Sequence, residues 1–371
     1  MLNNSVQRSL AERISLAPGR AISFAEAMET ALYMPEGGYY AQEPRKIGRK
    51  GDFYTAVSVG PLYGRLIAEA VNRVWEGLGR TDDFTLIEQG AHDGQLMEDV
   101  HQGLVEMGSV LATQADFCII EPQELYRQAQ EKRLRTRLGP RFGWADRVED
   151  LIERPAHGFF MTNELLDAFP VHRVQWTGET WIEIGVGFDE PGFVWKPMLN
   201  SPTHLQAEIA RLPTDLPPGH TTEVHPAARE WMNKVGATRF SGALLVADYG
   251  LDDEEYDSVE RSDGTVRRYR GHQMDGHVLR DLGECDITAH VRFSPLLECA
   301  KSAGFREEVY LDQGRFLTRL ATPWLKTLEK ASAPSDTAAS LRQFNTLTHP
   351  GQMGTRFRMC LLTRGIGKGV F

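Results

Sequence analysis

The chain has 371 residues, of which 41% are hydrophobic and 25% are charged, and it contains 35 glycines and 19 prolines. This composition is ordinary for a globular protein and excludes the collagen-like, disordered and disulfide-scaffold classes. The net charge is −10. A non-specific nucleic-acid binder needs a basic face to neutralise phosphates, so the charge argues against that class.

Cysteine spacing and the N-terminal pattern bear on the compartment of the protein. The four cysteines lie far apart and form no C-x-x-C pair, which favours thiols in a reducing compartment over a disulfide framework or a zinc ribbon. No apolar run is long enough to span a bilayer. Arginines near the N-terminus would suit a transit peptide, but apolar residues recur at every fourth position and predict an amphipathic helix: Leu2, Val6, Leu10 and Ile14.

Residues 1–80 are predicted to form a helical, loop-rich segment. Ser23 and Glu26 have the spacing of a capping box and precede a helix that a P-E-G-G sequence ends. A second helix is predicted over 61–79, because four apolar residues lie on one of its faces: Leu62, Leu66, Ala70 and Val74.

From residue 83 onward, short apolar runs alternate with helical stretches. This alternation indicates an α/β protein with a parallel, doubly wound sheet. The predicted strands are 84–90, 116–122, 158–170 and 242–250, the first two followed by helices at 95–108 and 125–139. A helix and a strand within 294–314 and a last strand at 357–365 complete the pattern.

One segment between these strands has a different character. Residues 171–197 are rich in Val, Ile, Trp and Phe and contain two turn sequences, so they are predicted to form an inserted β-meander. Two other segments, 251–280 and 330–352, are polar and are predicted to be loop-rich.

Acidic or amide side chains follow each of the first four predicted strands. A single such residue would as readily cap a helix, but four strand ends in succession predict a pocket, because ligands of doubly wound sheets bind at the carboxyl ends of the strands. The residues are Glu88, Glu121, Asn163 with Glu164 and Asp167, and Asp248.

The first two strand ends together suggest nucleoside binding. A glycine-rich turn, Gly90–Gly94, lets a ligand approach the backbone, and Glu121 is placed to accept both hydroxyls of a ribose. The G-x-G-x-x-G fingerprint of dinucleotide sites fails, because His92 stands at its second glycine. The spacing from Glu88 to Gly94 instead resembles the first motif of class I S-adenosylmethionine (SAM) methyltransferases.

Further segments resemble the MidA family of SAM-dependent methyltransferases, in the expected order and from about residue 20 to residue 366. They are ISFAEAMETALYMPEGGYY, IGRKGDFYT, NELLDAFPVHR, EVHPAAREW, GALLVADYG, GECDITAHVRF, QGRFLTRL and MGTRFRMCLLTRG. The resemblance implies a mostly parallel, seven-stranded Rossmann-like sheet. It also implies an N-terminal segment (1–80) covering the site, and a methyltransferase domain (81–371) with an insertion at about 171–240.

Two positions depart from the family's pattern. His92 replaces the central glycine of the first motif, and Ala56-Val57-Ser58 follows the G-D-F-x-T loop where the family has Ser-Pro-Glu. Histidine tolerates a positive φ better than most residues. Two outcomes are open for its ring: a hydrogen bond to the carboxylate of the methionine part of the cofactor, or obstruction of the pocket.

The resemblance also implies roles for individual residues. The cofactor, SAM, is expected to contact Glu88, Gly90, His92 and Gly94 through its methionine part and Glu121 through its ribose, with Asp52 and Thr55 closing the pocket. Glu164 and Asp167 are expected to grip the charged guanidinium of an acceptor arginine and Asn163 to orient it. Asp167 is equally well explained as a helix cap.

Two other functions remain open at this point: a family member that has lost the chemistry and acts as a binding or assembly factor, and a small-molecule methyltransferase. His272, His277, Cys285 and His290 have no standard metal-ligand spacing, so no metal site is predicted. The expected partner is a protein substrate, without nucleic acid or membrane, and a homodimer is compatible with the sequence. The expected location is the cytoplasm, or the mitochondrial matrix in a eukaryote.

Overall fold

The computed structural model describes residues 2–42, 55–151, 157–271, 273–328, 334–367, 369 and 371. The chain divides into two compact units. Unit 1 comprises Met1–Phe53, Leu166–Trp231 and Gly250–Leu296. Unit 2 comprises Tyr54–Leu165, Met232–Tyr249 and Leu297–Phe371. Among the described residues, no helix combines the length and the apolar character needed to cross a membrane.

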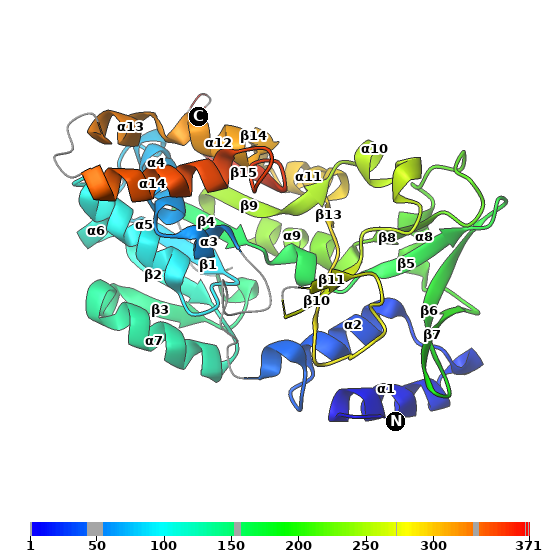
Figure 1. Ribbon diagram of the computed structural model, residues 1–371. Helices are drawn as coiled ribbons and strands as arrows, with labels where there is room; N and C mark the ends of the chain where they lie inside the picture. The colour runs from blue at the N-terminus through cyan, green and yellow to red at the C-terminus, as the bar shows by residue number, and fades with distance from the viewer. Residues whose placement is uncertain are drawn as a thin grey trace. The chain divides into compact units, whose positions relative to one another are not determined.

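The main sheet has the strand order β14-β15-β9-β4-β1-β2-β3, with the two-residue strand β13 (Val291–Arg292) paired to the end of β9 (Figure 1). Five neighbouring strands of this sheet are parallel to one another, namely β9, β4, β1, β2 and β3, and β15 runs antiparallel to both of its neighbours. The predicted doubly wound, mostly parallel sheet of seven strands is therefore confirmed. The bounds are β1 Thr85–Gln89, β2 Asp116–Ile120, β3 Phe142–Ala145, β4 His157–Asn163, β9 Ser241–Leu251, β14 Arg306–Asp312 and β15 Phe357–Arg364.

Helices pack against this sheet and form the core of unit 2. The predicted helix at 61–79 is α4 (Leu62–Gly77), and Leu62, Leu66, Ala70 and Val74 are all buried in that core. Burial of one apolar stripe is what stabilises such a helix in water. The other helices with residues in unit 2 are α3 Ala56–Val59, α5 Gln95–Glu106, α6 Leu111–Gln114, α7 Glu124–Leu138, α9 Pro226–Ala237, α11 Phe293–Ser302, α12 Gln313–Leu320, α13 Thr322–Leu328 and α14 Pro334–Thr348.

Unit 1 contains the N-terminal helices and two antiparallel sheets. The predicted amphipathic helix is α1 (Ser5–Leu16), and the predicted cap holds at α2 (Phe24–Tyr33), where Ser23 accepts a hydrogen bond from the backbone of Glu26. The predicted meander is confirmed as β5 (His172–Trp176), β6 (Trp181–Asp189) and β7 (Gly192–Pro197), with β8 (Thr221–Val224) on the other side of β5. The second sheet joins β11 (Gln273–Asp275), β10 (Arg267–Arg270) and β12 (Asp286–Thr288).

The prediction of loops at 330–352 is wrong, because α14 occupies most of that segment. Its apolar residues are few, but Leu347 is fully buried and its carbonyl accepts a hydrogen bond from the Gln313 side chain. The segment 251–280 is likewise more regular than predicted. It contains α10 (Asp253–Tyr256), β10 and β11, and Arg268 of β10 forms ion pairs with Asp275 and Asp281. Tertiary packing and side-chain pairing stabilise both segments despite their weak apolar patterns.

Candidate functional site

The loop after β1 has an unusual backbone. Gly90, His92 and Gly94 all have positive φ, at 80°, 48° and 85°. Non-glycine residues seldom adopt this conformation, and histidine is one of the exceptions. The Gln130 side chain donates a 2.8 Å hydrogen bond to the carbonyl oxygen of His92 and so holds the turn from α7. His92 therefore keeps the backbone conformation that a glycine would supply.

The side chains around His92 fix this loop further. The His92 ring meets Tyr126 edge to face, with ring centroids 5.6 Å apart. Asp93 pairs with Arg133, which also contacts Glu98 at 2.8 Å. Burial raises the pKa of Asp93, but His92 and Arg133 outweigh it and lower the pKa to about 2. These contacts hold the loop in one conformation, with its backbone available to a ligand.

Glu88, near the end of β1, is a buried carboxyl group whose Oε2 has no hydrogen-bond partner among the described residues. Only 2% of the residue is exposed. Burial and the nearby charges of Asp93 and Asp99 raise its pKa to about 8, although a hydrogen bond from the Met97 backbone opposes the shift. An unsatisfied acidic group at this depth calls for a cationic or hydrogen-bond-donating ligand.

Glu121 directly follows β2, next to β1 in the sheet. Its backbone N–H donates to Ala145, and its Oε1 accepts a 2.9 Å hydrogen bond from the backbone of Gln123. Burial raises the pKa of Glu121, against the opposing effects of Gln123 and Arg127. A carboxylate held in this way can accept hydrogen bonds from two neighbouring hydroxyls.

Glu164 directly follows β4, the other neighbour of β1. It has a φ of 53°, and its N–H donates to Ala247 of β9. Asn163 Nδ2 donates a 3.0 Å hydrogen bond to Glu164 Oε1, and Tyr63 Oη donates a 2.9 Å hydrogen bond to Asn163 Oδ1. We call this chain of Tyr63, Asn163 and Glu164 the carboxylate relay. Sequence reasoning missed Tyr63. The one feature that could have indicated it is its hydroxyl group, which lies among the apolar residues of α4.

The glycine loop and Glu164 lie close together. A side chain added at Gly90 would come within 3.3 Å of Leu165, the residue after Glu164. Asp248 lies within the neighbouring strand β9, not after its end as the sequence predicted, and accepts hydrogen bonds from the backbones of Leu165 and Tyr249 at 3.1 and 2.9 Å. Asp248 therefore has a structural role: it holds the turn that follows β4 against β9.

Asp167 belongs to unit 1, in the 3-10 turn Leu166–Ala168, and is 5% exposed. Its backbone oxygen accepts a hydrogen bond from Ala289. In the same unit, Tyr40 donates a 2.9 Å hydrogen bond to Asp286, and burial together with the charges of Asp286 and Asp167 raises the pKa of Tyr40. Sequence reasoning assigned no role to Tyr40 or Asp286, although both lie in the segments GGYY and GECDITAHVRF.

The structure thus gathers part of the predicted site at the carboxyl ends of β1, β2 and β4 in unit 2: Glu88, Gly90, His92, Gly94, Glu121, Asn163 and Glu164. Thr55 is buried in unit 2, where it and Ser58 cap α3 reciprocally. Asp52 lies outside the described residues.

Comparisons with known proteins agree with this geometry. The chain is 29% identical to the mouse protein arginine methyltransferase NDUFAF7, mitochondrial, with 92% of this chain and 80% of the mouse protein covered. It is 27% identical to the Drosophila melanogaster homologue, with 93% and 82% covered. A crystal structure from Burkholderia thailandensis with S-adenosyl-homocysteine bound is 29% identical, with a TM-score of 0.87 and with 99% of this chain and 94% of that chain covered.

The donor set fits SAM. The buried Glu88 carboxyl with an unsatisfied oxygen suits a cationic amino group, the glycine loop leaves space beside the backbone, and Glu121 suits a diol. SAM is the cofactor that the family description and the B. thailandensis structure indicate. A family model with the description "Putative S-adenosyl-L-methionine-dependent methyltransferase" matches residues 66–311. The chain therefore belongs to this family of SAM-dependent methyltransferases, as its resemblance to the MidA family predicted.

Proposed function

We propose that this methyltransferase modifies arginine side chains of a protein partner. Its relatives in mouse and fly bear the name protein arginine methyltransferase. The observation that carries the proposal is the carboxylate relay: an acid held by two hydrogen bonds in series, beside the loop that suits the cofactor.

SAM supplies the methyl group when it is bound. Glu88 would hold its amino group, the backbone of Gly90–Gly94 its carboxylate, and Glu121 its ribose hydroxyls. Gln130 keeps the loop in shape by holding the carbonyl of His92, and Tyr126 keeps the His92 ring in place. Asp52 and Thr55 are proposed to close this pocket.

The acceptor side poses a chemical problem, because a guanidinium is protonated at all physiological pH values and is a poor nucleophile. A carboxylate that binds two of its N–H groups fixes its plane and draws positive charge towards itself, which leaves the third nitrogen to be aimed at the methyl group. Glu164 suits this role, because the relay fixes its Oε1. We propose Asp167 as the second guanidinium-binding acid.

Most of the rate enhancement would then come from orientation. Methyl transfer is an in-line displacement, and holding the acceptor on that line replaces a bimolecular encounter with a pre-aligned one. Tyr63 and Asn163 contribute by fixing Glu164 and are positioning residues in this scheme.

The test is methylation of proteins from cells that lack this chain, with radiolabelled SAM and the purified protein. Methylarginine in a protein band, lost with Glu164→Gln at unchanged cofactor affinity, is the expected result. Label confined to the low-mass fraction would instead identify a small-molecule methyltransferase. Cofactor binding without any transfer would identify a binding or assembly factor. We propose the cytoplasm as the location, or the mitochondrial matrix in a eukaryote; the name of the mouse relative includes the word mitochondrial.

A further inference from the structure

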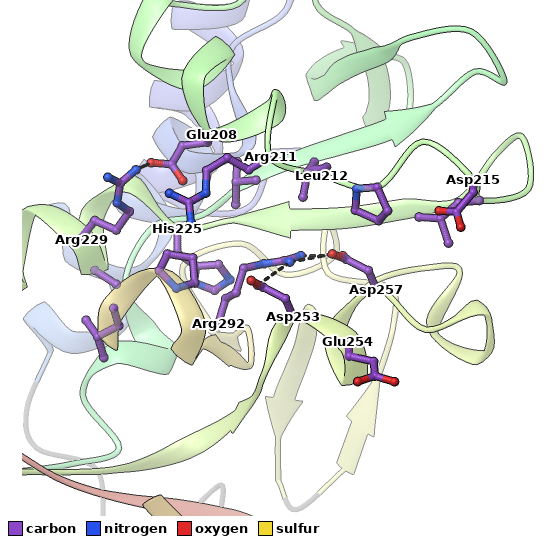
Figure 2. Close-up of a pocket in the computed structure, with 16 residues that line it drawn as sticks. Glu208, Arg211, Leu212, Asp215, His225, Arg229, Asp253, Glu254, Asp257 and Arg292 are labelled. Carbon is purple, nitrogen blue, oxygen red and sulfur yellow. Dashed lines mark hydrogen bonds and ion pairs between the residues drawn. The ribbon is translucent and has the colours of Figure 1, made fainter. Parts of the chain in front are cut away.

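Unit 1 contains a pocket that the proposed chemistry does not use. Its volume is about 430 Å³, within the range of ordinary ligand sites. Residues of α8 (Thr203–Ile209), the loop after it, α9, α10 and α11 line it, and every lining residue belongs to unit 1 (Figure 2). The pocket can therefore be described without reference to unit 2.

Part of the pocket wall is aliphatic. Leu212, Val224 and Leu296 line it and are each at most 8% exposed, and Leu216 lies beside them. Such a wall favours a ligand that brings methylene groups out of water. A bare metal ion or a small inorganic ion would gain nothing from it.

The charged lining has an excess of acid. Five carboxylates and three guanidinium groups line the pocket, which gives a net charge of −2. Arg292, 5% exposed at its side chain, is already bound to Asp253 at 3.0 Å and to Asp257 at 2.6 Å, and Arg229 is paired with Glu208 (Figure 2). Arg229 and Arg292 are thus both ion-paired through their terminal nitrogens, although the Nε atom of each has no hydrogen-bond partner among the described residues.

Two carboxylates have no such partner. Asp215 and Glu254 are exposed, and neither forms a hydrogen bond or an ion pair among the residues that the structure describes. Asp253 adds a third carboxylate with a half-exposed side chain. Asp253 also pairs with Arg292, so Asp215 and Glu254 are the two lining carboxylates that we take to be available to a ligand.

His225 adds an independent sign of a ligand that donates hydrogen bonds. It lines the pocket, is 5% exposed, and its Nδ1 has no partner in the described chain. Its Nε2 lies 3.0 Å from the Tyr256 hydroxyl, which itself donates to Glu223 or to the carbonyl of His290. We therefore assign the ring proton to Nε2, which leaves Nδ1 as a bare acceptor.

Burial lowers the pKa of His225 to about 3, so the ring is uncharged at neutral pH. A buried acceptor without a donor is unfavourable, and a donor brought into the pocket would remove that cost. An ammonium or guanidinium group has only donors to offer, whereas an anion has none.

We propose that this pocket docks a lysine or arginine side chain of the protein that the enzyme methylates. The methylene stem of that side chain packs on the aliphatic wall, and its charged end is attracted by the acidic lining, in which Asp215 and Glu254 have no partner of their own among the described residues. The inference rests on the proposed function in one respect: it takes the acceptor to be a protein. Docking at a second place would select a basic segment of that protein without touching the transfer site.

The test measures binding without methyl transfer. The probe is the peptide acetyl-Gly-Leu-Lys-Leu-Gly-amide, in which lysine keeps an arginine acceptor site out of the experiment, and norleucine replaces lysine in the control peptide. Binding is measured by calorimetry and by methyl NMR of the pocket leucines. We expect the lysine peptide to bind more weakly with added salt and the norleucine peptide not to bind.

The double variant Asp215→Asn/Glu254→Gln is expected to weaken lysine-peptide binding about tenfold, as two partly exposed ion pairs would. Neither residue has a partner within the described chain, so the fold is expected to persist. Glu179→Gln is the matched control, because Glu179 is an exposed carboxylate of unit 1 outside the pocket. The proposal would be overturned if the double variant bound the lysine peptide as tightly as the wild type, or if the wild type bound the norleucine peptide as tightly as the lysine peptide. Binding of spermidine without binding of the lysine peptide would overturn it as well.

A second readout separates this inference from the proposed function. With a methylated protein in hand, the double variant is expected to raise KM for that protein about tenfold and to leave kcat and the affinity for SAM unchanged. If no arginine is methylated, the proposed function fails, but peptide binding still tests whether the pocket docks a cationic side chain.

Discussion

Measuring the affinity for SAM against pH tests whether Glu88 holds the amino group of the cofactor. The pKa of Glu88 is about 8 in the cofactor-free protein, because the group is buried near two other acids. A cationic amino group is attracted to the ionised carboxylate and has no ion pair to form with the protonated one. Binding therefore requires the carboxyl group to lose its proton.

The size of the effect follows from that pKa. About 1% of Glu88 is ionised at about pH 6 and about half at about pH 8, so the contribution of Glu88 to the affinity is expected to rise roughly 50-fold over this interval. At neutral pH, binding is expected to release close to one proton per molecule bound. Most of the rise falls below pH 8, since ionisation approaches completion above it.

Calorimetry in two buffers of different ionisation enthalpy measures both the affinity and the proton release. Glu88→Gln is the matched control: the amino group of SAM itself titrates near pH 7.7–8.0, to judge from ordinary α-amino groups, and it does so equally with both proteins. The ratio of the two affinities isolates the contribution of Glu88. Identical pH profiles for the wild type and Glu88→Gln would refute the reasoning.

Three further predictions follow from the same site. The pKa of Glu88 in the folded protein lies above the ordinary value of 4.5, so its contribution to stability is complete below about pH 4.5 and is lost as pH rises towards 8. Glu88→Gln should therefore raise the Tm of the cofactor-free protein at pH 8 and have little effect at pH 5. Calorimetric melting at the two pH values measures this difference. Tyr63→Phe removes the hydroxyl that holds Asn163 and should lower kcat about tenfold through misalignment of Glu164, with KM for SAM unchanged; a loss of SAM affinity of the same size would point to a general structural role instead. His92→Gly should change the affinity for SAM less than about threefold, because the His92 backbone already has a left-handed conformation; a gain of tenfold or more would mean that the ring obstructs the cofactor.

The local pattern of the sequence was enough to locate β1, β2, β4, β9, β14 and β15, although it missed β3 and extended β4 past Asn163 to residue 170. Glu88, Glu121 and Glu164 could be placed at one edge of the sheet, because parallel strands end at the same edge and each acid follows an apolar run. The helix α4 and the meander could also be predicted, since the spacing of apolar residues distinguishes a helix from strands. These features depend on residues that are near one another in the chain.

Contacts between distant residues were beyond such reasoning. Tyr63 meets Asn163 across 100 positions, and Tyr40 meets Asp286 across 246. The helix α14 forms although its apolar pattern is sparse, because Leu347 is buried by other elements.

The sequence by itself determined which residue types follow the strands, which indicated a nucleoside ligand, and its resemblance to the MidA family identified that ligand as SAM. Only the tertiary structure decided that Glu164 is held through Asn163 by Tyr63, that Glu88 is buried with an unsatisfied oxygen, and that Asp215 and Glu254 border a pocket. The reason is physical: side-chain type and periodicity are local properties of the chain, whereas burial, hydrogen-bond partners and pKa depend on which distant segments are packed together.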